Sequence, residues 1–93
     1  MSRRYQVVNH DRIYDWLAGE DSPERREALL SWVAAASIDP EAVTTGYAMR
    51  AGSGHRFNVS YVRDAGCVVT FLISAAPVRA LIVLDVSAPT SVG

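Results

Sequence analysis

Two amphipathic segments in the first 40 residues predict a pair of helices. The first is "NHDRIYDWLAG", where Asn9 or Asp11 can cap the start and Gly19 suits the left-handed residue that ends many helices. Its apolar residues recur at the i, i+3, i+4 spacing of one helix face: Ile13, Trp16 and Leu17.

The second amphipathic segment carries clearer boundary signals. Ser22 stands at an N-cap position, Pro23 follows at the first helical position, and Glu24 lies in the first turn, where a carboxylate suits the helix dipole. Pro40 ends the segment, because proline disfavours helical backbone in the residue before it. The predicted apolar stripe consists of Leu29, Leu30, Val33 and Ala36.

Beyond residue 46, apolar and polar residues alternate with the period of two that is typical of strands. The apolar positions are odd-numbered on both sides of a glycine turn at 52–54, so they are predicted to share the core face. A three-residue loop at 52–54 pairs Met49 with Phe57 and Tyr47 with Val59.

A second turn, "DAG" at 64–66, is predicted to be another three-residue hairpin loop, with Gly66 at the position that requires left-handed backbone. This loop sets odd residues of one strand opposite odd residues of the next. The predicted partners are Tyr61 with Val69, Val59 with Phe71, and Phe57 with Ile73.

Two further runs complete the predicted sheet. "RYQVV", Arg4 to Val8, is a candidate first strand, and "RALIVLDV" is a last strand that is apolar at almost every position. The last run has more apolar positions than a one-sided sheet can hide. It is therefore buried by the helices on one face and by the N-terminal segment on the other, or it contacts another chain.

The predicted fold is α+β, with two N-terminal helices on one face of a small antiparallel sheet, in the order β-α-α-β-β-β with an error of one strand allowed. Residues 1–93 form a single domain by length. One core is predicted to contain Trp16, Leu17, Leu29, Leu30, Val33, Tyr47, Phe57, Val59, Tyr61, Val69, Phe71 and Ile73.

Composition narrows the classes of function. No apolar run is long enough to cross a bilayer, and the chain is expected to be cytoplasmic with no membrane partner. Cys67 is the only cysteine, which excludes an internal disulfide and a multi-cysteine metal site. The two histidines have no metal-binding spacing, so we expect neither a metal nor any other cofactor.

Charge divides unevenly along the chain. Residues 1–41 carry eight acids and five arginines, whereas residues 42–93 carry two acids and four arginines. The near-neutral total of −1 therefore hides an N-terminal half of charge −3 and a C-terminal half of charge +2.

Polar residues are predicted to line the sheet face opposite the core. This face is either the solvated side of a small sheet or a surface that holds an anion, most simply RNA phosphate, through arginine forks. The predicted register also places Arg50 opposite Arg56, a repulsion that an anionic ligand or a helix acid would offset. The candidate anion-binding residues are Arg50, Arg56, Asn58, Ser60 and Thr70.

The passage "SGHRFNVSYVRDAGCVVTFLIS" resembles the RelE/ParE toxins of bacterial toxin–antitoxin pairs. Gly54-His55-Arg56 falls on the G-x-R element of that superfamily, Asp64-Ala65-Gly66 on its acidic turn, and 68–74 on its apolar strand. The resemblance implies two helices on a curved antiparallel sheet. It also implies a metal-independent endoribonuclease or a gyrase poison that an antitoxin neutralises.

The same resemblance implies catalytic roles for Arg56, for His55 as a proton carrier, and for Arg79. Active ribonucleases of this superfamily follow the third sheet strand with a basic cluster and place acid–base groups near the C-terminus. Here Pro77-Val78 stands where basic residues are expected, and Asp85 is the only ionisable residue after Arg79. Whether the protein is an enzyme therefore stays open, and binding is expected more than cleavage.

Three classes of function remain. The first is a toxin-like protein that acts on RNA, the ribosome or a replication target and has an antitoxin partner. The second is a non-catalytic protein-interaction module on the same fold, such as an inhibitor or regulatory subunit encoded by a phage or mobile element. The third is a structural or regulatory α+β subunit, which only base rates support.

Overall fold

The computed structural model describes residues 4–49, 56–75 and 77–88. Within them the chain forms two α-helices and five strands, together with a single 3-10 turn. In chain order the elements are β1 (Gln6–Val8), α1 (Asp11–Ala18), α2 (Pro23–Ile38), β2 (Gly46–Met49), β3 (Arg56–Val62), η1 (Arg63–Ala65), β4 (Cys67–Ser74) and β5 (Ala80–Ser87). The protein is α+β, as predicted, with the helix pair ahead of four of the strands.

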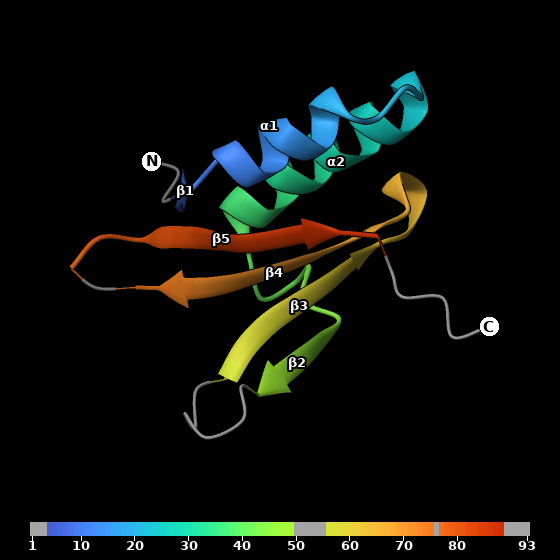
Figure 1. Cartoon of the computed structure of the whole chain (residues 1–93). Coiled ribbons are helices and arrows are strands. Elements are labelled where there is room, and N and C mark those ends of the chain that lie inside the picture. The colour runs from blue at the N-terminus through green and yellow to red at the C-terminus, as the bar shows by residue number, and fades with distance from the viewer. Residues whose placement is uncertain (1–3, 50–55, 76, 89–93) are drawn as a thin grey trace.

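The five strands form one mixed sheet in the order β1-β5-β4-β3-β2 (Figure 1). Strands β2 to β5 pair antiparallel, but β1 runs parallel to β5. The prediction of a purely antiparallel sheet was wrong at this edge, because the chain crosses over through both helices between β1 and β2. The described sheet also has one strand more than the order β-α-α-β-β-β, within the error that the prediction allowed.

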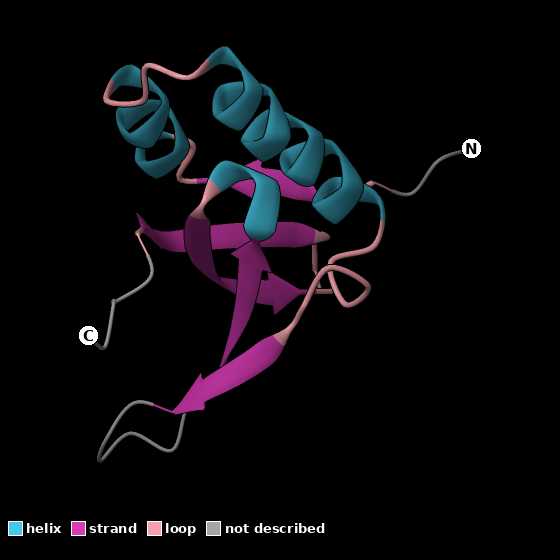
Figure 2. Cartoon of the chain, turned by 90° about the vertical axis from the view of Figure 1, so that its right-hand side faces the viewer, coloured by secondary structure: helices cyan, strands magenta, loops and turns pink. Residues whose placement is uncertain are grey.

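Both helices lie on one face of the sheet (Figures 1 and 2). They cover a core to which α1, α2, η1, β3, β4 and β5 contribute. Trp32 and Phe71 pack edge to face in it, with ring centroids 5.6 Å apart. The buried apolar residues are Ile13, Leu17, Leu29, Trp32, Ala36, Val62, Ala65, Cys67, Val69, Phe71, Leu81 and Val83.

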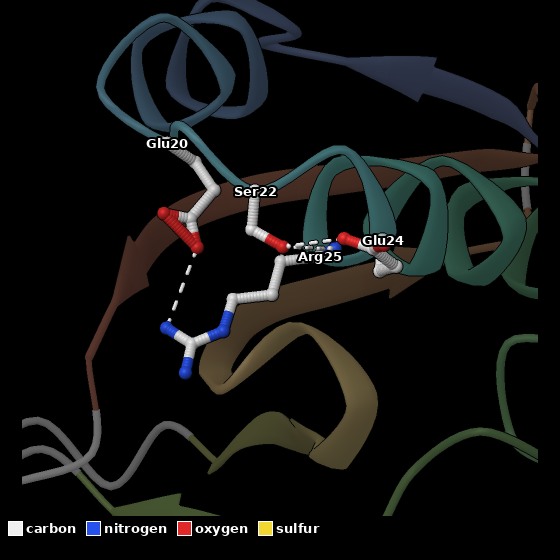
Figure 3. A network of polar contacts seen from close by, with 4 residues as sticks. All are labelled: Glu20, Ser22, Glu24 and Arg25. Carbon is white, nitrogen blue, oxygen red and sulfur yellow. Dashed lines mark hydrogen bonds and ion pairs between the residues drawn. The ribbon is translucent and has the colours of Figure 1, made fainter.

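Helix α2 begins as the sequence predicts. The Ser22 hydroxyl accepts a hydrogen bond from the backbone N–H of Arg25 at 3.3 Å and donates one to Glu24 Oε2 at 3.1 Å (Figure 3). The backbone N–H of Glu24 and the Ser22 hydroxyl lower the pKa of the Glu24 carboxyl. Arg25 also forms an ion pair with Glu20 at 3.4 Å, which ties the loop before α2 to its first turn.

Removing this cap should weaken the fold measurably. We expect Ser22→Ala to lower the free energy of unfolding by about 1 kcal/mol, because the Arg25 N–H loses its acceptor at an exposed helix end. Urea denaturation measures the change. Ser31→Ala, in the exposed middle of α2, is the control and should cost nothing, since alanine is the better helix former. Equal losses in the two variants would contradict the capping role.

Helix α1 differs from its predicted ends. Its N-cap is His10, whose side chain makes no capping bond, so neither Asn9 nor Asp11 has that role. Asn9 instead has a φ of 64°, a left-handed conformation that asparagine tolerates and that turns the chain from β1 into the helix. Gly19 has a right-handed φ of −92°, so the predicted left-handed C-terminal glycine was wrong.

The buried stripe of α2 is formed by Leu29, Trp32 and Ala36, with Val33 half-buried beside it. Leu30 was predicted to belong to this stripe but is 50% exposed. One residue along a helix is a rotation of about 100°, so a stripe centred on Leu29 and Trp32 turns Leu30 toward solvent.

The register between β3 and β4 differs by one residue from the prediction. Gly66 has the predicted left-handed backbone, with a φ of 65°. The hairpin closes at the pair Val62–Cys67, however, so the loop has four residues, three of which form η1. Val59 therefore lies opposite Thr70, and Asn58 lies opposite Phe71.

This shift turns β3 over. Its even-numbered residues Asn58, Ser60 and Val62 are buried beneath the helices, alongside the odd-numbered Val69 and Phe71 of β4. A change of one residue in pairing moves a whole strand's side chains to the other face. The predicted core residues of β3 were therefore placed on the wrong face: Phe57, Val59 and Tyr61.

The other predicted core residues divide into three groups. Leu17, Leu29, Val69 and Phe71 are buried as predicted. Trp16, Val33 and Ile73 are half-buried and pack against the core. Tyr47 is 52% exposed on the edge strand β2, as is Met49, at 66%, which was predicted to share the core face.

The pairing of β2 with β3 sets Met49 opposite Arg56. The connection therefore spans six residues, 50–55, instead of a three-residue loop. The predicted pairing of Arg50 with Arg56 was wrong, because Met49 occupies the position opposite Arg56.

A β-bulge interrupts the pairing of β4 with β5. Thr70 lies opposite Asp85, but the next residue of β4, Phe71, lies opposite Val83, so Leu84 is the extra residue. The bulge lets Val83 and Val86 both face the core. Leu84 and Asp85 are thereby directed to the other face of the sheet.

Candidate interaction surface

The residues predicted to bind an anion do not lie on one surface. Arg56 is exposed at the start of β3, with its guanidinium carbon 4.4 Å from the centre of the Tyr47 ring. Arg50 and His55 lie outside the described residues. Arg79 is exposed just before β5, and its guanidinium carbon is 5.6 Å from the Tyr5 ring. Arg56 and Arg79 are thus each placed against a tyrosine.

Asn58 and Ser60 are buried in a hydrogen-bond network that supports the fold. The Asn58 amide donates to Thr44 Oγ1 at 3.1 Å. The Ser60 hydroxyl accepts from the Trp32 indole at 2.8 Å and donates to the backbone carbonyl of Val43 at 2.6 Å. Both side chains fasten the segment after α2 to β3, so neither is available to a ligand.

Thr70 lies on the opposite side of the sheet from Asn58 and Ser60, since it pairs with Val59. The predicted polar face is therefore split. Two of its residues lie in the core, one lies on the far face, and Arg56 is at the rim. The prediction of one polar face failed because it depended on the pairing of β3 with β4, which the four-residue loop shifts by one residue.

The face of the sheet away from the helices is mainly apolar, and we call it the outer face. Strand pairing and the alternation of side chains assign its residues from β3, β4 and β5. The outer face consists of Phe57, Val59, Tyr61, Val68, Thr70, Leu72, Ile82, Leu84 and Asp85, with the small residues Ser74, Ala80 and Ser87 at its two ends.

No helix or strand of the described residues covers the outer face; both helices pack on the other side (Figure 2). Tyr61 is 47% exposed, and the six other large apolar residues of this face are half-buried. None of the seven packs against the core cluster. An apolar sheet face without a covering layer is typical of a binding surface.

Charge on the outer face is confined to one end. Asp85 is its only carboxylate, beside Thr70, and Tyr61 projects nearby at the end of β3. Arg63 follows two residues later, in η1. Among the described residues, the side chains of Asp85, Tyr61 and Arg63 have neither a hydrogen bond nor an ion pair to another residue.

Sequence reasoning missed most of this surface. Val68, Leu72, Ile82 and Leu84 were not singled out as site residues, although they lie in runs that are apolar on both strand faces. That two-sided pattern was the available signal. It was recognised for "RALIVLDV" and correctly pointed to more apolar surface than the helices cover. The expected cover by the N-terminal segment was wrong, because β1 lies beside β5 within the sheet.

Neither a cavity nor a cluster of metal-ligating side chains is found in the part of the chain that the structure describes. None of the described helices combines the length and the apolar character needed to span a membrane. The fold and this surface define a class, a two-layer α+β protein with one open sheet face. No family model, curated protein or solved structure matches the chain.

Cys67 lies wholly in the core at the start of β4. Burial raises the pKa of its thiol to about 11, and the Glu20 carboxylate adds to the rise. A shift from 9 to 11 lowers the reactive thiolate fraction about 100-fold near neutral pH.

We therefore expect Cys67 in the folded protein at pH 8 to react with a disulfide reagent at least about 100-fold more slowly than in urea. An absorbance time course measures both rates. The control is an exposed thiol made by Ser31→Cys on α2, which should react at the ordinary rate in the folded protein. Equal rates at the two thiols would contradict the buried position of Cys67.

Proposed function

We propose that the protein is a non-catalytic protein-interaction module that binds another polypeptide chain through the outer face. The observation that supports this proposal is the set of seven apolar side chains on a sheet face that no described element covers. Burying apolar surface contributes about 25 cal/mol per Å², so covering several of these residues supplies a substantial driving force.

The chemistry of the outer face suits a protein partner better than a nucleic acid or a small metabolite. Interfaces between proteins combine an apolar, aromatic-rich centre with a polar rim. Here the apolar part includes Phe57, Val59 and Leu72, and the polar groups of Asp85 and Tyr61 lie toward one end of it. A nucleic-acid surface depends on arginine and lysine, and the only charged outer-face residue is an acid.

Photo-crosslinking in cells tests this function. A photoreactive phenylalanine derivative in place of Leu72, on the middle strand of the outer face, should give a discrete adduct with a polypeptide. The same group in place of Ala34, exposed on α2, is the matched control and should give none. A second change, Val59→Lys, should abolish the adduct at position 72. The proposal is overturned if position 72 gives no more adduct than position 34.

A toxin-like function is the second candidate, supported by the order of elements with two helices on one sheet face and by the exposed Arg56. In this proposal the resemblance to RelE/ParE toxins extends to function, in the cytoplasm, with RNA or the ribosome as target and an antitoxin as partner. Asn58 and Ser60 take no part in it, since both are buried. Anion binding would then fall to Arg56 and to Arg50, which lies outside the described residues.

Binding of RNA and growth arrest test the toxin-like function. We expect Arg56→Ala to weaken RNA binding and to reduce its dependence on salt by about one unit of slope, because one phosphate contact is lost. Arg26→Ala, on the exposed side of α2, is the matched control. If Arg56→Ala alters neither RNA affinity nor toxicity, this candidate function is eliminated.

A further inference from the structure

We propose that the chain that covers the outer face is a second copy of this protein, in a symmetric face-to-face dimer. The twofold axis runs parallel to the strands, above β4. This inference rests on the proposed function and names its partner. Two features of the outer face lead to it: its size and the placement of its few polar groups.

The size of the outer face suits a small homodimer. It spans β3, β4 and β5, strands of seven and eight residues. At about 3.3 Å per residue and about 4.8 Å between strands, its footprint is roughly 25 Å by 15 Å, and side chains project from all of it. Specific interfaces begin at about 600 Å² of accessible surface per partner, and a footprint of roughly 375 Å² with projecting side chains and its rim brings this face close to that lower bound.

Two sheets that pack face to face are a common solution for exposed apolar sheet surface. They lie about 10 Å apart with strands aligned to within about 30°. The outer-face residues of β3 and β4 include Phe57 and Leu72 toward one end and Tyr61 and Val68 toward the other, with Val59 and Thr70 between them. Large side chains at both ends allow the two faces to interdigitate along their length.

Symmetry determines which groups meet. Val59, Thr70 and Asp85 lie side by side across β3, β4 and β5. A twofold axis above β4 and parallel to it exchanges the two sides of the sheet, so β5 of one copy lies over β3 of the other. Asp85 then lies over Val59 of the second copy's β3, and Tyr61 is the next outer-face residue along that strand.

This arrangement gives the unpaired polar groups their partners. Tyr61 lies about 7 Å along the strand from Val59, so its hydroxyl can reach Asp85 of the other copy. Arg63, exposed two residues further on, can extend its guanidinium toward the same carboxylate, and symmetry forms these contacts twice. The two Asp85 carboxylates are kept about 10 Å apart, the width of two strand spacings, so they repel little. The face is complementary to itself in charge as well as in apolar character.

Sedimentation equilibrium of the whole chain tests the dimer. At about 0.1 mM we expect a mass of twice 10.1 kDa for the unchanged protein. Val59→Lys should return the mass to that of one chain while the circular dichroism spectrum keeps the folded form. Leu30→Lys, at a residue 50% exposed on α2, is the matched control and should leave the dimer intact.

A charge exchange tests the axis. Asp85→Arg and Arg63→Asp should each raise the dimer dissociation constant about 10-fold, because each places like charges together. The double variant should restore it to within about threefold of the unchanged protein, since the pair is re-formed with opposite polarity. Failure of the double variant to recover would overturn the proposed axis.

A mass of one chain for the unchanged protein, or a dimer that Val59→Lys leaves intact, would overturn the inference. The crosslink at position 72 separates this failure from failure of the proposed function. An adduct with a different polypeptide alongside a monomeric protein eliminates only the second copy as partner. The absence of any adduct in a monomeric protein eliminates both.

Discussion

Replacing Phe71 with alanine is expected to lower the free energy of unfolding by about 3 to 5 kcal/mol. Phe71 is fully buried at the centre of β4 and packs edge to face against Trp32. Its removal deletes the largest fully buried side chain and leaves a cavity that the surrounding strands and helix cannot close. Urea denaturation followed by tryptophan fluorescence measures the loss.

Phe57 provides the matched control, since it is the same residue type on the neighbouring strand but on the outer face. Phe57→Ala should cost about 1 kcal/mol or less, because its ring is only half-buried and its removal leaves no closed cavity. Both variants are best compared in the Val59→Lys background, which removes any contribution of self-association. Equal losses at the two positions would contradict the assignment of the two faces.

Replacing Ser60 with alanine is expected to cost about 1 to 3 kcal/mol, although only one oxygen is removed. The Ser60 hydroxyl joins the Trp32 indole N–H to the Val43 carbonyl, and its loss leaves both groups buried without their partner. Ser60 itself is 1% exposed, so water cannot readily replace the hydroxyl.

Thr70→Ala is the control for Ser60→Ala, because both residues were predicted to share one polar face. Thr70 lies on the outer face, and its loss should change the free energy of unfolding by less than about 0.5 kcal/mol. Thermal and urea denaturation measure both variants. A larger effect at Thr70 than at Ser60 would support the predicted register and contradict the structure.

The sequence was sufficient to predict both helices, the positions of the strands and the start of α2. Ser22 and Pro23 mark the start of α2 through local hydrogen-bonding chemistry, which needs no tertiary context. The left-handed Gly66 follows from its lack of a side chain. Both features are properties of a few consecutive residues, which is why pattern and spacing identify them.

The register of β3 could not be predicted because it depends on the length of a loop. A three-residue loop at 64–66 and a four-residue loop at 63–66 both place Gly66 correctly. They differ only in whether Arg63 belongs to the strand or to the turn. The alternation of β3 then favoured the wrong choice, since Phe57, Val59 and Tyr61 are its more apolar set.

The structure explains why the less apolar set lies inside. The chain leaving α2 runs beside β3 in irregular backbone, and its polar groups need partners where no strand supplies them. Asn58 and Ser60 supply these partners at Thr44 and Val43. The polar residues of β3 thus form hydrogen bonds with buried polar groups of the segment after α2. The apolar residues of β3 are therefore left on the outer face. The candidate site was missed for the same reason.

Cross-strand NMR contacts between β3 and β4 test the central claim, that β3 turns its apolar side chains away from the helices. The structure predicts backbone contacts that join Asn58 with Phe71, Val59 with Thr70, and Ser60 with Val69. Contacts that join Val59 with Phe71 and Tyr61 with Val69 would contradict it, because they would return Phe57, Val59 and Tyr61 to the core and remove three of the seven apolar residues from the outer face.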